Sequence, residues 1–229
     1  MIKPGDNVVI VGDSWACGEW AAISKTAPPD KYNMLFPNYR MIHSGLTLFL
    51  QNFGCSVNNL GIPGGSNIES LDALTNYLSE KRPDIIYWFQ TDPARDFDID
   101  TWKSFNSLSE FSEQKLIRLA HAYKEFNSLG VPIQCIGGLY KLNTDLMTPY
   151  TNLKPFIVSV IEMFEGTQPE HINPASLVEL ELLSYEFIEE LSTIPHMRTL
   201  LPKQWFYPDG GHPNRYAHKK IFEYILNYK

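Results

Sequence analysis

Short runs of apolar residues alternate along this chain with longer stretches in which apolar residues recur every three or four positions. The apolar runs cover residues 8–11, 55–60, 84–89 and 131–136, of which 55–60 is the weakest. A run that is apolar throughout, with no regular polar positions, is typical of a strand buried on both faces of a parallel sheet. The pattern therefore predicts four strands of one central, mostly parallel sheet.

The stretches between and after these runs have helical spacing. Strands that alternate with helices build layered α/β proteins. We therefore expect a three-layer α/β/α sandwich of the flavodoxin-like kind, formed as a single domain over residues 1–229. The helices are predicted at residues 41–53 (ended by Gly54), 66–78, 111–129 (ended by Gly130), 176–191 and 214–228.

Two stretches do not fit this alternation. Residues 27–39 are rich in proline and aromatic residues, and residues 140–166 have no clean period. Long loops on a rigid scaffold often carry specificity, so both stretches are candidates for loop insertions at the mouth of a site. Surface loops packed by their own aromatic side chains are the equally weighted alternative.

Composition and charge narrow the function classes. The net charge is −7 and the sequence pI about 5.4, with no basic stripe, so a nucleic-acid partner is not expected. No secretory signal and no run of roughly 18 apolar residues is visible, which predicts a soluble cytoplasmic protein without a membrane partner. A phage-encoded protein, or one exported by another route, stays an alternative.

The cysteines and histidines do not point to a cofactor. Cys17, Cys55 and Cys135 are odd in number and far apart, and the histidines do not cluster at the spacing of metal ligands. We therefore predict reduced thiols, no metal and no cofactor. The oligomeric state is open.

Candidate chemistry lies at the two ends of the chain. The tripeptide 12–14, Gly-Asp-Ser, follows the first predicted strand, and Asp209 and His212 stand three apart before the last predicted helix. A serine hydroxyl becomes a nucleophile when a histidine takes its proton and a carboxylate orients that histidine. Each motif alone is weak, since Ser14 could simply begin a helix and residues 209–212 could form a turn.

The positions and the order of these motifs make the set more specific than any one of them. Gly-Asp-Ser-x-x-x-Gly at 12–18, Asn-x-Gly-x-x-Gly-x-Ser at 59–66 and Asp-x-x-His at 209–212 occur in this order across almost the whole chain. In this the chain resembles the SGNH (GDSL-type) hydrolase family. The resemblance implies the three-layer fold and a serine esterase that works through an acyl-enzyme intermediate without a cofactor.

The resemblance also implies roles for individual residues. Ser14 would be the nucleophile, His212 the general base and Asp209 the residue that orients the imidazole. The backbone N–H groups of Ser14 and Gly64 would form an oxyanion hole, with glycine at 64 because no Cβ can stand between the backbone and the substrate.

The third block of the family, Gly-x-Asn-Asp, is not matched. Asp92 stands where the asparagine is expected and Gln90 replaces the glycine. An ionised Asp donates no hydrogen bond and would repel an oxyanion. Four alternatives stay open: Asp92 is protonated, Gln90 or Thr91 donates in its place, Arg95 neutralises the site, or the hole is incomplete and the protein slow or inactive.

Four further residues are candidates for substrate binding, namely Trp15, Asp13, Thr91 and Arg95. For Trp15, which directly follows the serine, packing in the core is an equal alternative. Cys17 lies three residues after Ser14, and we interpret it as a small packing residue rather than a nucleophile.

The sequence thus predicts a serine esterase acting on a short acyl group of a small molecule, including O-acetyl groups on a carbohydrate. The altered third block favours an alternative of another class, a non-catalytic binding or structural module of a phage or cell-surface assembly. A third alternative is an acyltransferase that passes the same acyl group to a sugar alcohol.

Overall fold

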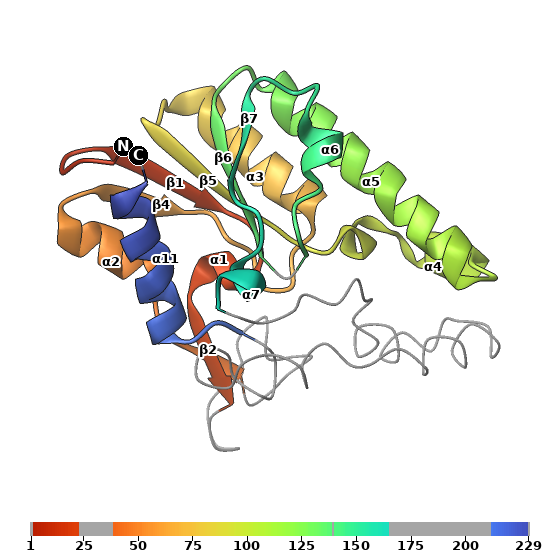
Figure 1. The fold of residues 1–229 in the computed structure, drawn as a ribbon, viewed down its shortest axis with the longest axis horizontal. Helices are drawn as coiled ribbons and strands as arrows, with labels where there is room; N and C mark the ends of the chain where they lie inside the picture. The colour runs from red at the N-terminus through yellow and green to blue at the C-terminus, as the bar shows by residue number, and fades with distance from the viewer. Residues whose placement is uncertain (1, 23–38, 139, 165–211, 229) are drawn as a thin grey trace.

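The structure is a computed structural model, and it describes residues 2–22, 39–138, 140–164 and 212–228 (Figure 1). The predicted helix at 176–191 and residues 27–38 of the first predicted insertion lie outside these ranges.

The central sheet has five parallel strands in the order β4-β1-β5-β6-β7. Four of them confirm the predicted strands, and the fifth was not predicted. The strands are β1 Asn7–Val11, β4 Ser56–Asn59, β5 Ile85–Gln90, β6 Ile133–Gly137 and β7 Leu153–Ile157.

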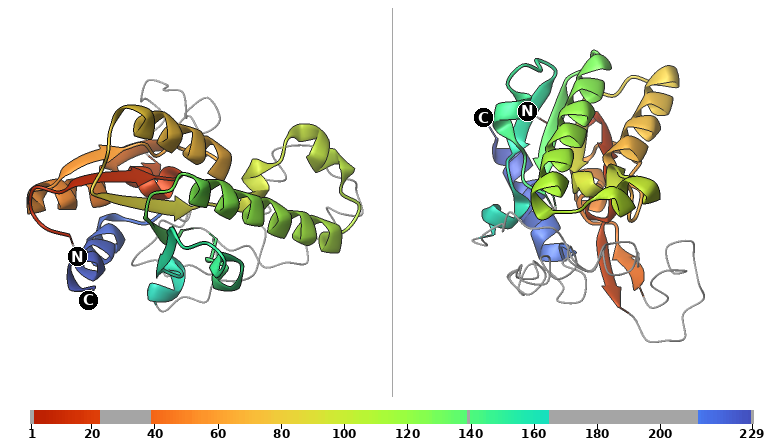
Figure 2. Two further views of the ribbon diagram at one scale, coloured as in Figure 1. Left: turned by 90° about the horizontal axis from the view of Figure 1, so that it is seen from above. Right: turned by 90° about the vertical axis from the view of Figure 1, so that its right-hand side faces the viewer.

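Helices cover both faces of this sheet (Figures 1 and 2). Val8 and Ile10 of β1 pack in one apolar cluster with α2 (Leu46–Phe53) and α11 (Arg215–Asn227). Val9 and Val11 point to the other face, where the core is completed by α3 (Asn67–Glu80) and α5 (Leu108–Ser128). Full burial of each such side chain is worth roughly 1.5–3 kcal/mol. The three-layer α/β/α prediction is therefore confirmed.

The two helices on the second face match the predicted spacing closely. They are α3 Asn67–Glu80 and α5 Leu108–Ser128, and the predicted C-terminal helix is α11. Ser66 begins α3 with a capping box in which its hydroxyl accepts from the Glu69 N–H while the Glu69 carboxylate accepts from the Ser66 N–H.

The interpretation of residues 140–166 as a loop insertion was wrong for the part that the structure describes. This part contains α6 (Thr144–Met147), the edge strand β7 and α7 (Val160–Met163). In β7, Lys154 and Pro155 are exposed, which breaks the apolar run that would have identified a strand. Proline is tolerated at a sheet edge because no further strand needs its missing N–H there.

The predicted helix at 41–53 was too long. Its first residues instead belong to β3 (Tyr39–His43), which pairs antiparallel with β2 (Glu19–Ala22) in a separate two-stranded sheet. The helix α2 begins at Leu46 and ends at Phe53, and Gly54, which follows it, has a left-handed backbone with φ 105°. Besides α6 and α7, the structure has further short helices that were not predicted: α1 Ser14–Cys17, the 3₁₀ helix η2 Pro93–Asp96 and α4 Ile99–Ser104.

The topology brings three loops together at the carboxyl ends of the parallel strands. β4 lies on one side of β1 and β5 on the other, so the strand order reverses at β1. In open parallel sheets ligands bind at such a switch point, outside the carboxyl ends of the strands. The loops after β1, β4 and β5 all start from these ends, beside α1 (Figure 1). None of the helices in the described ranges is long and apolar enough to cross a membrane.

Candidate active site

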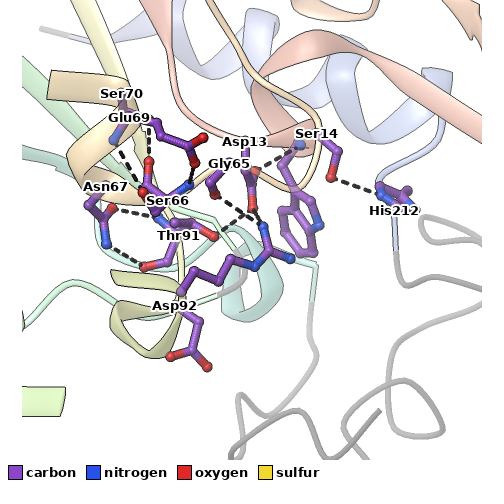
Figure 3. A network of polar contacts seen from close by, with 12 residues as sticks. Asp13, Ser14, Gly65, Ser66, Asn67, Glu69, Ser70, Thr91, Asp92 and His212 are labelled. Atoms are coloured by element: carbon purple, nitrogen blue, oxygen red, sulfur yellow. Dashed lines mark hydrogen bonds and ion pairs between the residues drawn. The ribbon is translucent and has the colours of Figure 1, made fainter. Parts of the chain in front are cut away.

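The first and last of the three motifs, which are far apart in sequence, meet at the carboxyl end of β1. The Nε2 atom of His212 lies 2.9 Å from the Ser14 hydroxyl, although the two residues are 198 positions apart (Figure 3). Ser14 is the first residue of α1, and His212 stands just before α11. Both residues are buried, with 2% and 7% of their surface exposed. This distance is that of a hydrogen bond between a hydroxyl and an imidazole nitrogen.

The third member of the predicted triad, Asp209, lies outside the described residues. Its role in orienting His212 stays a prediction.

A glycine allows the sharp turn between β1 and α1. Gly12 has φ 146°, and a Cβ at this position would lie 2.6 Å from the Phe89 carbonyl oxygen on β5. Only a residue without a side chain fits so close to the neighbouring backbone. The motif glycine therefore brings the nucleophile's loop directly against β5.

The loop after β4 is tied to the nucleophile's loop. The Asn59 amide donates at 2.8 Å to the Ala16 carbonyl in α1 and to the Thr47 hydroxyl in α2. The Ile62 N–H donates to the Gly12 carbonyl at 2.8 Å. Two residues later, Gly64 is exposed and has φ 72°, a left-handed conformation that favours glycine. The second motif thus runs alongside the first.

Asp13 joins the nucleophile's loop to the segment after β5. One carboxylate oxygen accepts from the Trp15 N–H at 2.9 Å and so caps α1. The other accepts from the Thr91 hydroxyl at 2.7 Å and from Arg95 Nη1 at 2.8 Å (Figure 3). Asp13 and Thr91 are both buried. Their polar groups hold the loops together, and their role in substrate binding stays a prediction.

Asn67 fixes the position of Thr91. Its side-chain oxygen accepts from the Thr91 N–H at 3.1 Å, and its amide donates to the Thr91 carbonyl at 3.3 Å. The same amide donates to the Asp96 carboxylate at 3.0 Å, which also accepts from the Ile68 N–H. Burial raises the pKa of Asp96 above its usual value, while these hydrogen bonds act to lower it. The loop after β5 is therefore held from two directions, by Asp13 and by α3.

Asp92 pairs with a buried lysine. Lys115 Nζ on α5 lies 2.8 Å from the Asp92 carboxylate, and both side chains are almost completely buried. The same ammonium group stands 4.5 Å from the centre of the Tyr140 ring. Asp92 also accepts from the Ala94 N–H at 2.9 Å, as the cap of η2. In Figure 3 the Asp92 side chain extends away from Ser14, on the far side of Thr91.

Gln90 is also engaged elsewhere. Its amide donates to the Lys141 carbonyl at 3.3 Å, and its oxygen accepts from the Tyr123 hydroxyl at 2.6 Å. Thr91 donates to Asp13, and Asp92 pairs with Lys115. Each of the three polar side chains at 90–92 therefore has a partner other than Ser14. The proposals that Gln90, Thr91 or Asp92 supplies an oxyanion donor gain no support from these contacts.

The cations are distributed differently from what the sequence suggested. The sequence offered Arg95 as the group that would neutralise Asp92, but Arg95 pairs with Asp13 and Lys115 pairs with Asp92. Sequence reasoning missed Lys115, Asn67 and Tyr123. Lys115 lies in a helix with many charged positions, and nothing in the local pattern marks it as buried.

Trp15 and Cys17 belong to the packing of α1. Trp15 is 2% exposed and lies in the apolar cluster with β1 and α2, so core packing describes it better than a place in a substrate pocket. Burial raises the pKa of the Cys17 thiol to about 12, with the nearby Asp13 charge adding to the effect. The thiol is therefore protonated at neutral pH. Among the described residues, no three His, Cys, Asp or Glu side chains are grouped so that they could hold a metal ion.

No protein-family model matches the chain, and no curated protein matches it. A solved structure similar to it is Axe2, an acetylxylan esterase from Geobacillus stearothermophilus, with 17% identity over 98% of this chain and 94% of that one and a TM-score of 0.41. A lipase/acylhydrolase from Enterococcus faecalis is 16% identical over 96% and 93%, with a TM-score of 0.38. LAE5, an alpha/beta hydrolase from the metagenome of Lake Arreo, Spain, is 16% identical over 98% and 95%, with a TM-score of 0.43. These values are too low to assign an activity to this chain.

Proposed function

We propose that this protein is a serine esterase of the SGNH type that hydrolyses short acyl esters. The observation that carries the proposal is the 2.9 Å contact between His212 Nε2 and the Ser14 hydroxyl, at the switch point of the sheet. A nucleophile and a base within hydrogen-bond reach, at the place where such folds bind ligands, are the minimum that acyl transfer needs.

The reaction follows from this contact. The Ser14 oxygen attacks the ester carbonyl carbon while His212 Nε2 accepts the hydroxyl proton, and the carbonyl electrons move to the oxygen. When the tetrahedral intermediate collapses, the alcohol leaves with the proton from His212, and the acyl group stays on Ser14. A water molecule, deprotonated by His212, then releases the acid and restores the serine. Asp209 would hold the imidazole in the tautomer that this sequence needs.

The oxyanion would be bound by the backbone N–H groups of Ser14 and Gly64. The left-handed backbone and exposure of Gly64 support this role. The contacts of Gln90, Thr91 and Asp92 hold these side chains on Lys141, Tyr123, Asp13 and Lys115, so we count none of them as a third donor. Removing one such donor typically lowers kcat about 10²- to 10³-fold. We therefore expect turnover that is slow for this class of enzyme.

For the substrate we propose a short acyl ester, including O-acetyl groups on a carbohydrate. The burial of Ser14 supports a small acyl group, since the hydroxyl is approached through little open surface.

The test uses p-nitrophenyl acetate and a fluorophosphonate probe. We expect the wild-type protein to turn over the ester and to be labelled, and Ser14→Ala to lose labelling and at least about 10⁴-fold in kcat/KM. Cys17→Ala is the matched control in the same helix, and it should retain the wild-type rate because the Cys17 thiol is protonated. Absence of turnover and labelling in the wild type, or equal labelling of Ser14→Ala, would contradict the proposal.

A second function is favoured by the third block. Because Asp92 pairs with Lys115 instead of donating to a substrate, a module that binds esters without hydrolysing them would have the same contacts. Such a module would leave p-nitrophenyl acetate intact and would bind an acetylated oligosaccharide with the same Kd in the wild type and in Ser14→Ala. Isothermal titration calorimetry measures both Kd values.

A further inference from the structure

The Arg95 guanidinium connects two loops of the candidate site. Its Nη1 atom lies 2.8 Å from the Asp13 carboxylate and 3.4 Å from the Gly65 carbonyl. The side chain comes from η2, a third segment, and remains 24% exposed while Asp13 is 2% exposed. One cationic group therefore touches the segments that follow β1, β4 and β5.

The two residues that Arg95 contacts, Asp13 and Gly65, are neighbours in sequence of Ser14 and Gly64, whose N–H groups would form the oxyanion hole. Asp13 is bonded to Ser14, and Gly65 is bonded to Gly64. The tip of the Gly64 loop turns back on itself through a hydrogen bond from the Gly65 N–H to the Ile62 carbonyl at 2.8 Å. Arg95 joins this tip to the nucleophile's loop, beyond the point where the Ile62 N–H meets the Gly12 carbonyl.

We propose that Arg95 is a positioning residue, which fixes the spacing between the Ser14 and Gly64 N–H groups by bridging Asp13 and the Gly65 carbonyl. This inference rests on the proposed esterase function. Because the side chains of the third block bind other partners, the proposed hole depends on two N–H groups from separate loops. Misplacement of a catalytic group by about 1 Å can lower the rate 10²-fold, so a link between these loops is directly relevant to turnover.

The chemistry of the side chain suits this task. A guanidinium is planar, stays charged and offers several N–H donors in a rigid fork, whereas the lysine ammonium is a point charge on a flexible stem. The Arg95 charge is matched by the Asp13 carboxylate at 2.8 Å, which argues against a role in attracting an anionic substrate. The predicted role of Arg95 as a substrate-binding residue is therefore replaced here by one that acts through the loops.

The first test compares Arg95→Met and Arg95→Lys with the wild type on p-nitrophenyl acetate. We expect Arg95→Met to lower kcat about 10- to 100-fold with KM within about threefold of wild type, and Arg95→Lys to fall between the two. Arg118→Met is the matched control, because Arg118 is also half-buried and lies near the same segment, 5.8 Å from the Phe97 ring. It should retain the wild-type kcat. Wild-type kcat in Arg95→Met would overturn the proposal.

A second measurement separates this inference from the esterase function. Hydrogen–deuterium exchange of the peptide that covers residues 60–66 should become about tenfold faster in Arg95→Met, with α3 unchanged, whether or not the protein hydrolyses esters. Unchanged exchange would overturn the proposal. A neutral and an anionic ester, p-nitrophenyl acetate and mono-p-nitrophenyl succinate, give the last comparison. Loss of activity in Arg95→Met on the anionic ester alone would also overturn it and identify Arg95 as a substrate-binding residue.

Discussion

Two ion pairs hold the candidate site, and they differ in their surroundings. In both, a cationic nitrogen lies 2.8 Å from an aspartate oxygen. Lys115 is 5% exposed beneath the loop after β5, whereas Arg95 is 24% exposed and bridges the loops around Ser14. Asp92, the partner of Lys115, stands where the SGNH pattern has an asparagine, and Asp13, the partner of Arg95, belongs to the matched Gly-Asp-Ser motif.

The difference in exposure between the two ion pairs leads us to expect different roles for them. A charge buried as completely as Lys115 must have its partner, because an unpaired charge in a low-dielectric interior is very unfavourable. Breaking the Arg95–Asp13 pair costs less, because Arg95 is partly exposed and the buried Asp13 carboxylate keeps the Trp15 N–H and the Thr91 hydroxyl as donors. We therefore expect the Lys115 pair to determine mainly the free energy of unfolding, and the Arg95 pair mainly the rate of turnover.

The largest effect on stability should come from Lys115→Met. The substitution leaves the Asp92 carboxylate buried without its cation, and we expect it to lower the free energy of unfolding by about 3–5 kcal/mol. Urea denaturation followed by circular dichroism measures this. Lys220→Met is the matched control, because Lys220 pairs with Glu223 on the exposed side of α11 and should change stability by less than about 1 kcal/mol. Equal effects of the two substitutions would contradict the distinction between the pairs.

Asp92→Asn is the next most informative change, because it restores the asparagine of the family pattern. We expect it to destabilise the protein by about 3 kcal/mol, since Lys115 then has no carboxylate partner. In the double variant Asp92→Asn, Lys115→Met, most of this loss should be recovered, because no buried charge remains unpaired.

The double variant also tests whether Asp92 limits turnover. If its kcat on p-nitrophenyl acetate exceeds that of the wild type, the aspartate is a defect in the oxyanion hole; an unchanged kcat would assign it to structure alone. A double variant no more stable than Asp92→Asn would contradict the pairing as the source of the effect.

The smallest of these effects should come from Thr91→Val, which removes the hydroxyl that donates to Asp13 and keeps the shape of the side chain. Asp13 retains Arg95 and the Trp15 N–H, so we expect a loss of about 1.5–3 kcal/mol, as for one hydrogen bond to a charged group. Thermal unfolding measures it, and Thr75→Val, which removes an exposed hydroxyl on α3, is the control. If Thr91→Val is as neutral as this control, Asp13 does not depend on Thr91.

Much of the scaffold could be predicted from the sequence. The residues of β1 are apolar on both faces because both faces are covered, and this needs no knowledge of the partners. The capped helices α3 and α5 also follow from local signals. The edge strand β7 could not be found in this way, because the exposed Lys154 and Pro155 interrupt its apolar residues and leave no continuous apolar run.

Part of the candidate site could also be predicted from the sequence, and part of it could not. The Gly-Asp-Ser motif and the glycine loop were recognisable because turns and close backbone contacts require particular residues at particular spacings. The partners of the third block were not, since Lys115 and Asn67 reach it from helices distant in sequence.

By itself, the sequence determined the layered fold and identified Ser14 and His212 as the residues to bring together. The tertiary structure decided which cation each aspartate receives, Lys115 for Asp92 and Arg95 for Asp13. The physical reason is that local patterns reflect interactions within a few residues, whereas the pairing of buried charges depends on which side chains the packing of α5 and η2 brings within reach.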